Sequence, residues 1–411
     1  MEVSEAPFTR DPLAIDAMHD LPSFYRELRD HHPVYYYEDY DTFFISRFED
    51  VWRLLRVGDN VFTAVETNLP TPDYLRNNRN TGHPPAFASI EPMAAMPLLA
   101  SPWYEQMRNA HMPPLRPKTV RAQADFIREV TNARLDALLP LGKFDMVTEF
   151  AGVVAAASIC QLFGLPSERA KGLFDDVNEA TRPNAEGVVD FAHFFTKVIA
   201  YIIPCIQARR DAGADGGNAL IDGLVNWRSA EGRALCDKEI ADQLVCAMVG
   251  GLESVSKVTA GGIMELWRGS GQLDEVRADP TTNVVLAVNE MVRHCAPAQY
   301  SFRTVHRDVT LAGTRIQAGQ RVCAMIYSAA HDEREFDDPE AFVWNRRAER
   351  VVSFGLGQHH CIGKHLALLE VRIMVEEFLA RVPDFHFVMD EAALNPSYFQ
   401  HGWIRLPVVV G

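Results

Sequence analysis

The segment from Lys238 to Arg268 constrains the fold more than any other part of this sequence. Its pattern is helical over its whole length, and Asp237 is a suitable N-cap. About thirty residues at 1.5 Å each span about 45 Å, which is enough to cross a complete domain. We therefore expect a single domain that is crossed by one long helix.

The rest of the chain predicts more helices and only a little sheet. Ala122–Leu139 and Val189–Ala208 carry apolar residues at three- and four-residue spacing, and Pro204 is expected to kink the second helix. The glycine-rich break at 212–218 is too short for a domain linker. No shift in composition marks a boundary, so we expect residues 1–411 to form one mainly α domain with small β-sheets.

Short strands are expected near both ends of the chain. The two aromatic runs in Val34–Ser46 are typical of a β-hairpin. After Asp308, β-branched runs alternate with glycines, which predicts small strands and turns. A helix is expected at 361–380 and a last strand at 403–410. Residues 63–102 hold seven prolines, and we expect a long functional loop there.

The charge and hydropathy of the chain narrow the classes of partner. Forty basic and 55 acidic side chains give a formal net charge of −15, which repels phosphate backbones and argues against nucleic acid. The sequence does not open on a basic region followed by an apolar core, and no apolar run reaches the ~18 residues of a membrane span. We expect a cytoplasmic monomer, with the most apolar stretch, 150–165, as a buried helix.

The seven cysteines are at least ten residues apart, so no CxxC pair exists and a disulfide framework is not expected. They stand at positions 160, 205, 236, 246, 295, 323 and 361. Six lie in apolar helical or strand surroundings and are expected to be packing residues. Cys361 differs, because it lies in a glycine-punctuated loop that runs into a helix.

The surroundings of Cys361 favour the ligand form of its thiol. Backbone N–H groups and the macrodipole at a helix start lower the pKa of a thiol and favour the thiolate that binds metals. A single thiolate on a glycine loop fits an axial haem ligand best. A zinc site with His359, His360 and His365 is an alternative, although a structural zinc usually takes two or more thiolates. A packing cysteine is the third interpretation.

This loop resembles the haem-binding signature of the cytochrome P450 superfamily. All six fixed positions of that ten-residue pattern are filled, by Phe354, Gly355, Gly357, His359, Cys361 and Gly363. The resemblance implies a single-domain P450 fold, with haem b between the long central helix and the cysteine loop and Cys361 as the axial iron ligand. A thiolate ligand pushes electron density toward the iron and favours O–O cleavage.

The same resemblance implies a structural trio beneath the cysteine loop. Glu290 and Arg293 are three residues apart on a predicted helix, a spacing that places both on one face. Superfamily members have such an ExxR pair upstream of the cysteine loop, and a second arginine lies between that pair and the loop. Arg346 lies where that arginine is expected.

Midway along the long helix, Gly250 and Gly251 precede Glu253 and Ser254. Two interior glycines cost a helix about 2 kcal/mol relative to alanine, so we expect a reason for them. By resemblance, this segment faces bound dioxygen, and an acid and an alcohol deliver protons. Ser254 replaces the usual threonine and lacks its methyl group, so proton delivery is expected to be looser.

The resemblance also implies partners for the two haem carboxylates. Arg303 matches the arginine that the family places there, and His359 matches a second partner. Arg108 and Tyr104 match an upstream pair, although Tyr104 stands where histidine is common.

The implied activity is insertion of one oxygen atom from O2 into a small hydrophobic substrate, by hydroxylation, demethylation or epoxidation. Electrons are expected from a separate [2Fe–2S] ferredoxin with its reductase, docking near Lys364 and Arg108. A peroxide-driven peroxygenase and a non-catalytic haem-binding or sensor protein are the alternatives. By family position, the residues expected to line the substrate pocket are Cys246, Val249, Gly250, Ala298 and Phe399.

Overall fold

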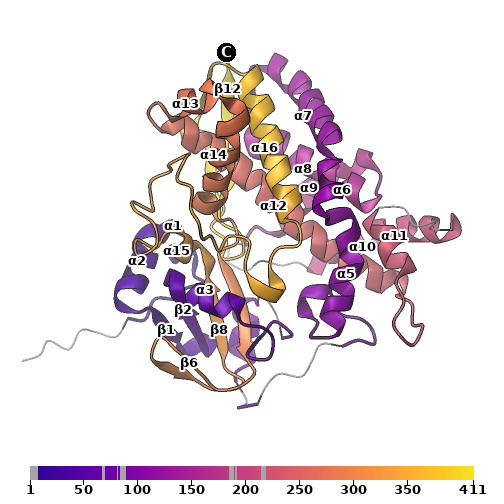
Figure 1. Cartoon of the computed structure of the whole chain (residues 1–411), viewed down its shortest axis with the longest axis vertical. Coiled ribbons are helices and arrows are strands. Elements are labelled where there is room, and N and C mark those ends of the chain that lie inside the picture. Colours follow the sequence, from indigo (N-terminus) through magenta and orange to yellow (C-terminus); the bar gives the residue numbers. More distant parts are fainter. Residues whose placement is uncertain are drawn as a thin grey trace, which may run out of the picture.

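The computed structural model describes residues 8–66, 70–80, 82–83, 89–184, 189, 192–213 and 219–411. Figure 1 shows a β-rich region with α1, α2, α3 and α15 at the lower left, and the other labelled helices above it and to the right. The α-helices are α1 (Ile15–His19), α2 (Leu21–His31), α3 (Phe48–Arg56), α4 (Pro72–Asn77), α5 (Trp103–Leu115), α6 (Pro117–Arg121), α7 (Ala124–Leu138), α8 (Gly152–Phe163), α9 (Ala170–Ala180), α10 (Ala192–Asp211), α11 (Leu220–Asn226), α12 (Asp237–Arg268), α13 (Gln272–Ala278), α14 (Pro280–Cys295), α15 (Ile326–Ala330) and α16 (Lys364–Arg381).

The long helix predicted from the sequence is α12, at the centre of the helical region. It packs against α8, α9, α10, α14 and α16. Its N-cap is Cys236, one residue before the expected Asp237, because the Glu239 carboxylate accepts the Cys236 N–H at 2.7 Å and fixes that start. The helix is unbroken across both interior glycines.

The main sheet has the strand order β1-β2-β8-β5-β3. The predicted hairpin at 34–46 is confirmed, since Tyr35 pairs with Phe44 in antiparallel register. The strands are β1 (Val34–Tyr37), β2 (Thr42–Ile45), β3 (Phe62–Thr63), β4 (Lys143–Asp145), β5 (Tyr300–Val305), β6 (Val309–Leu311), β7 (Thr314–Ile316), β8 (Arg321–Met325), β9 (Phe385–Phe387), β10 (Ala393–Leu394), β11 (Trp403–Arg405) and β12 (Pro407–Val410). Smaller sheets pair β4-β12-β9, β10-β11 and β6-β7.

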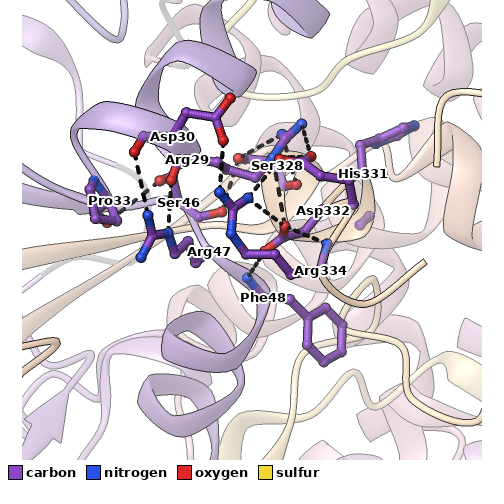
Figure 2. A network of polar contacts seen from close by, with 12 residues as sticks. Arg29, Asp30, Pro33, Ser46, Arg47, Phe48, Ser328, His331, Asp332 and Arg334 are labelled. Carbon is purple, nitrogen blue, oxygen red and sulfur yellow. Dashed lines mark hydrogen bonds and ion pairs between the residues drawn. The ribbon is translucent and has the colours of Figure 1, made fainter. Parts of the chain in front are cut away.

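A buried polar network joins the N-terminal helices to α15 (Figure 2). Arg29 on α2 donates to the Ser328 carbonyl at 3.2 Å, and the Ser328 hydroxyl donates to the Ser46 carbonyl at 2.9 Å. The Asp332 carboxylate accepts the first N–H of α3, at Phe48, at 2.7 Å. The network therefore fixes the position of α15. The carbonyl of its last residue, Ala330, accepts a hydrogen bond from Arg293, as described below.

Several sequence predictions change in detail. The final helix begins at Lys364, and the single strand expected at 403–410 is two strands in two sheets. The loop predicted at 63–102 contains α4, while its residues 67–69, 81 and 84–88 lie outside the described residues. Residues 190–191 and 214–218, within the predicted helix start and the glycine-rich break, also lie outside them.

The most apolar stretch of the chain is a core segment of the protein. A π-helical turn, η4 (Met146–Ala151), continues into α8, so that 146–163 is long and apolar enough to span a membrane. However, 78% of this segment is buried inside the protein, as expected for a core helix.

Candidate active site

The cysteine loop lies against the end of α3. Gly357 opens the short 3-10 turn η6 (Gly357–His359) with a φ of +63°, and a Cβ there would lie 2.9 Å from the Leu55 carbonyl oxygen. The Cys361 N–H donates to the Phe354 carbonyl at 2.7 Å and closes the loop. Only glycine fits this approach at 357, which explains one of the fixed glycines.

The Cys361 side chain is exposed, yet protein atoms crowd its sulfur. Burial therefore raises the pKa of the Cys361 thiol, while the backbone N–H of Gly363, Arg108 and the backbone N–H of Lys364 lower it. The net direction is upward, so the prediction of a lowered pKa is wrong for the protein alone, because desolvation outweighs the N–H groups. The predicted N–H groups are present, and a coordinated metal deprotonates a thiol outright.

The other six cysteines agree with their expected packing role except one. Cys160 and Cys323 are buried, and Cys205, Cys246 and Cys295 are half-buried. Cys236 is exposed at the N-cap of α12, so the expected packing role is wrong for this residue.

Two of the predicted carboxylate partners form one hydrogen-bonded pair on α5. The Arg108 guanidinium donates to the Tyr104 hydroxyl at 3.0 Å, and that hydroxyl donates to the Gln358 carbonyl at 2.9 Å. The guanidinium also lies 3.0 Å from the Nε2 atom of His360. Tyr104 thus connects α5 directly to the cysteine loop. Tyr104 and Arg108 therefore lie beside the loop that carries Cys361.

Arg303 and His359 join the same cluster. The Tyr104 and His359 rings contact each other with centroids 4.3 Å apart, and His359 Nε2 lies 2.8 Å from an Asp59 oxygen. Burial lowers the pKa of the Arg303 guanidinium to about 10, while nearby Asp59 and Tyr104 raise it. A buried arginine and a second arginine in one cluster give a site suited to anionic groups.

Asp59 was missed by the sequence analysis. It follows α3 in a loop, and its second oxygen is buried without a hydrogen-bond partner among the described residues. Its distance of 300 residues from His359 leaves no local pattern that could have identified it.

One face of α12 is open midway along the helix. Cys246, Val249 and Ser254 are half-buried and Gly250 is exposed, at spacings of three and four residues that align them on one face. A Cβ at Gly250 would meet no atom within 4 Å, whereas one at Gly251 would lie 2.8 Å from the Ile159 Cδ1 atom. Gly251 thus permits close packing of α8, and Gly250 widens the open face.

The acid and the alcohol predicted for proton delivery lie on different faces of α12. The Ser254 hydroxyl is beside the open face and donates to the Gly250 carbonyl at 2.9 Å. Glu253 is buried, and its Oε1 atom accepts from the Lys257 ammonium at 2.6 Å. Lys257 was not singled out from the sequence, although its i,i+4 spacing from Glu253 is a readable signal.

Two of the segments predicted to form a substrate pocket lie side by side. Ala298 pairs with Gln400 in an isolated antiparallel bridge, and the His401 N–H donates to the Pro297 carbonyl at 2.7 Å. Phe399, which directly precedes Gln400, is buried. The predicted pocket residues on α12 share its open face, as described above.

The expected trio is assembled beneath the loop. Arg293 forms two hydrogen bonds of 2.8 Å with the Glu290 carboxylate, and Arg346 donates to the same carboxylate at 2.9 Å. Burial would raise the pKa of Glu290, but Arg293, the Val343 N–H and Arg346 hold it below its usual value. Arg293 also donates to the Ala330 carbonyl at the end of α15, at 2.6 Å.

The remaining motif residues lie around the start of α16. Lys364 places its ammonium 5.5 Å from the centre of the Phe354 ring, and Gly363 is the N-cap of the helix. Within the described residues, no group of three or more His, Cys, Asp or Glu side chains is arranged to hold a metal ion, which disfavours the zinc alternative.

Known proteins resemble this chain in sequence and in fold. The cytochrome P450 family profile matches residues 280–402. Cytochrome P450 123 of Mycobacterium tuberculosis is 27% identical, covering 100% of this chain and 99% of the relative. A steroid C26-monooxygenase of Mycolicibacterium smegmatis is 32% identical over 304 residues, which cover 71% of this chain and 73% of that protein.

The fold agrees with solved structures of the same family. Ligand-free cytochrome P450 TbtJ1 superposes with a TM-score of 0.80 at 25% identity, covering 96% of this chain and 98% of that one. The cysteine loop, the open face of the central helix and these relatives lead to one conclusion. The chain belongs to the cytochrome P450 family of haem-thiolate monooxygenases.

Proposed function

We propose that residues 1–411 act as one monooxygenase domain in which the Cys361 thiolate binds the iron of haem b. The observation that carries the proposal is that this P450-family chain has two features that a haem site requires. One is a thiol on a glycine loop beside a cluster of basic side chains, and the other is the open face of α12. The thiol and the basic side chains suit a haem, because its iron would need such a ligand and its carboxylates would need cations or hydrogen-bond donors.

The basic cluster is proposed to hold the haem carboxylates. Arg303 and Arg108 would supply charge-assisted hydrogen bonds, and His359 would supply a further donor. Tyr104, whose hydroxyl donates to the Gln358 carbonyl, would hold Arg108 in position. His359 already pairs with Asp59 at 2.8 Å, so we propose that this acid orients the imidazole. Phe354, Gly355 and Gly363 would shape the loop around the thiolate.

The bound haem supplies dioxygen activation and oxygen transfer. The chain itself positions the substrate, excludes water and moves protons. We assign the last task to Glu253 and Ser254, since a carboxylate and a hydroxyl on adjacent residues can pass a proton from the buried side of α12 to its open face. The Gly250 carbonyl, which accepts the Ser254 hydroxyl, fixes the resting direction of that hydroxyl.

A small hydrophobic molecule is the proposed substrate. Cys246, Val249, Gly250, Ala298 and Phe399 offer apolar surface without a charged anchor, which favours such a ligand. Oxygen insertion would produce hydroxylation, demethylation or epoxidation according to the bond presented. Because one relative is a steroid C26-monooxygenase, steroids are the first class to test.

A ferredoxin is the proposed electron donor. A groove of about 220 Å³ lies between α6, α14 and α16, lined by Val285, Leu368, Arg121, His365 and Arg372. It is close to the start of the helix that follows Cys361. A groove with an apolar floor and basic edges fits an acidic [2Fe–2S] protein. We also propose a cytoplasmic location.

Electron delivery is tested with a charge reversal. Arg121→Glu should slow reduction by ferredoxin about tenfold at low salt, and the difference should shrink as salt is raised. Arg315→Glu, an equal charge change on β7 with a side chain that is 72% exposed, is the control. Equal rates for the two variants would place the docking site elsewhere.

The central assignment is tested by spectroscopy. The reduced, carbon monoxide-bound protein should show the red-shifted Soret band of thiolate ligation, and Cys361→Ala should abolish it. Cys236→Ala, at the other exposed cysteine among the described residues, should leave the band unchanged. An unchanged band in Cys361→Ala would refute the ligand. A panel of steroids, terpenoids and aromatic compounds, screened for a Soret shift and then for oxidised product, tests the substrate class.

A further inference from the structure

A cavity of about 310 Å³, with a mixed polar and apolar lining, lies along the C-terminal half of α12. Lys257 and Glu265 line it from the helix, and His294, Glu340 and His401 line it from other elements. Its walls also include His19, which is exposed, and Arg268, whose side chain is 58% exposed. The cavity therefore extends from the surface to a buried lysine and can hold several water molecules.

Lys257 connects this cavity to the proposed proton-delivering acid. Its ammonium donates to the Glu253 Oε1 atom at 2.6 Å, and the two side chains are 2% and 1% exposed. The other carboxylate oxygen, Oε2, is buried without a partner among the described residues. The lysine stem passes against Gly402, where a Cβ would lie 3.0 Å away, so the chain is held in place.

We propose that protons enter the active site through this cavity and that Lys257 passes them to Glu253. The inference rests on the proposed role of Glu253 and Ser254. In each transfer, an N–H bond of the Lys257 ammonium breaks and an O–H bond forms on Glu253, which leaves a neutral amine and a neutral acid. The amine then takes a proton from a hydronium ion in the cavity, which leaves a water molecule that exchanges with bulk solvent. Glu253 returns to the carboxylate when its proton passes on to Ser254.

The charges around Lys257 suit a group that gives up a proton. Burial lowers the pKa of its ammonium, Glu253 raises it, and Arg182, which follows α9, lowers it again. Burial and Lys257 lower the pKa of His401 to about 4, so this imidazole is neutral near pH 7. A lysine in such surroundings can exchange its proton, whereas an arginine cannot.

Further titratable groups line the cavity wall, and burial shifts the pKa values of most of them toward the neutral form. Burial raises the pKa values of Glu265 and Glu340 and lowers that of His294 to about 4. The Cys295 thiol and the Tyr327 phenol, which also line the cavity, have pKa values raised by burial. Lys257 is the buried cationic side chain on this wall that contacts Glu253, which positions it to relay a proton.

The first measurement is infrared spectroscopy of the holoenzyme. In Lys257→Met, the buried Glu253 loses its cation and should become protonated, which adds the C=O stretch of a neutral carboxyl group. The band should be absent from the double variant Lys257→Met/Glu253→Gln. Lys238→Met is the matched control, since Lys238 forms an exposed i,i+4 pair with Asp242 on the same helix. A missing band in Lys257→Met would overturn the coupling of the two residues.

The second measurement separates proton relay from charge pairing. Lys257→Met should lower product formed per electron about tenfold and increase the solvent isotope effect, while Lys238→Met should match the native protein. Lys257→Arg keeps a cation on Glu253 but holds its proton, so it should show no carboxyl band and remain impaired. Full activity in Lys257→Arg would overturn the relay.

The two proposals can fail separately. If Glu253→Gln and Ser254→Ala both retain native product per electron, the proposed function of that pair fails. If these two variants are impaired and Lys257→Met equals Lys238→Met, only the proton entry through Lys257 fails.

Discussion

Two buried ion pairs, one on α14 and one on α12, differ in how completely their carboxylate oxygens are hydrogen-bonded. On α14, every carboxylate oxygen of Glu290 is hydrogen-bonded, and two arginines share the charge. On α12, Glu253 has one lysine and one oxygen without a partner. Since an incompletely paired buried charge is expensive, a chain retains it where a proton or a ligand has to move. The saturated trio is a structural anchor, and the unsaturated pair is the candidate for function.

A third buried acid completes the comparison. Within the part of the chain that the structure describes, Glu370 on α16 has the Ser158 hydroxyl of α8 beside it but no cation, and burial raises its pKa to about 8. Glu290 thus has two arginines beside it, Glu253 has one lysine, and Glu370 has no cation. The number of cationic partners determines whether a buried acid is held charged or neutral.

The largest effect is expected from breaking the saturated trio. Arg293→Ala leaves the Glu290 charge buried with only Arg346 and frees the Ala330 carbonyl, which should destabilise the protein by about 3–5 kcal/mol. The measurement is urea unfolding of the holoenzyme. Arg268→Ala, at an exposed i,i+3 pair with Glu265 on α12, should cost less than about 1 kcal/mol. Similar losses for both variants would contradict the anchoring role.

The next effect is expected from Glu370 and depends on pH. The folded-state pKa of about 8 lies above the ordinary value of 4.5, so the folded state binds more protons between these values. Stability should therefore be highest below pH 4.5 on account of this group and fall as pH rises to about 8. Glu370→Gln should remove that slope and stabilise the protein by roughly 3 kcal/mol near pH 7. Parallel stability–pH curves for the two proteins would show that Glu370 does not stay neutral.

The two ion pairs should also differ in how much stability is lost when their acids are made neutral. Glu290→Gln leaves arginines that cannot lose their protons, so it should cost about 3–5 kcal/mol. Glu253→Gln leaves Lys257, whose pKa is lowered by burial, and the amine can become neutral, so about 1 kcal/mol is expected. Unfolding at matched pH measures both. Equal losses would remove the contrast on which the functional assignment of the α12 pair depends.

Motif residues were accessible from the sequence because their roles depend on local geometry. The glycines around Cys361 and the three-residue spacing of Glu290 and Arg293 are readable in the sequence, and the resemblance to the P450 superfamily implies their roles. Burial does not follow from spacing. The i,i+4 relation of Glu253 and Lys257 is the same as that of Lys238 and Asp242, yet one pair is buried and the other exposed. Likewise, Asp59 meets His359 only through the tertiary fold, and the direction of the Cys361 pKa depends on crowding around the sulfur.

The smallest expected effect concerns Ser254, on the open face beside the unsaturated pair. Ser254→Ala should lower product per electron by at least about threefold and raise hydrogen peroxide release, because the hydroxyl that passes the proton is gone. Folding stability should not change measurably, since this hydroxyl contacts only the Gly250 carbonyl among the hydrogen bonds above. Ser256→Ala is the matched control, because its hydroxyl donates to the Glu253 carbonyl from a buried position two residues away. Ser254→Thr should raise product per electron above the native value, because the added methyl group restricts the hydroxyl to fewer rotamers. If Ser254→Ala and Ser256→Ala have equal effects, the position of the hydroxyl on the open face has no special role, and proton transfer from Glu253 has to proceed by water alone.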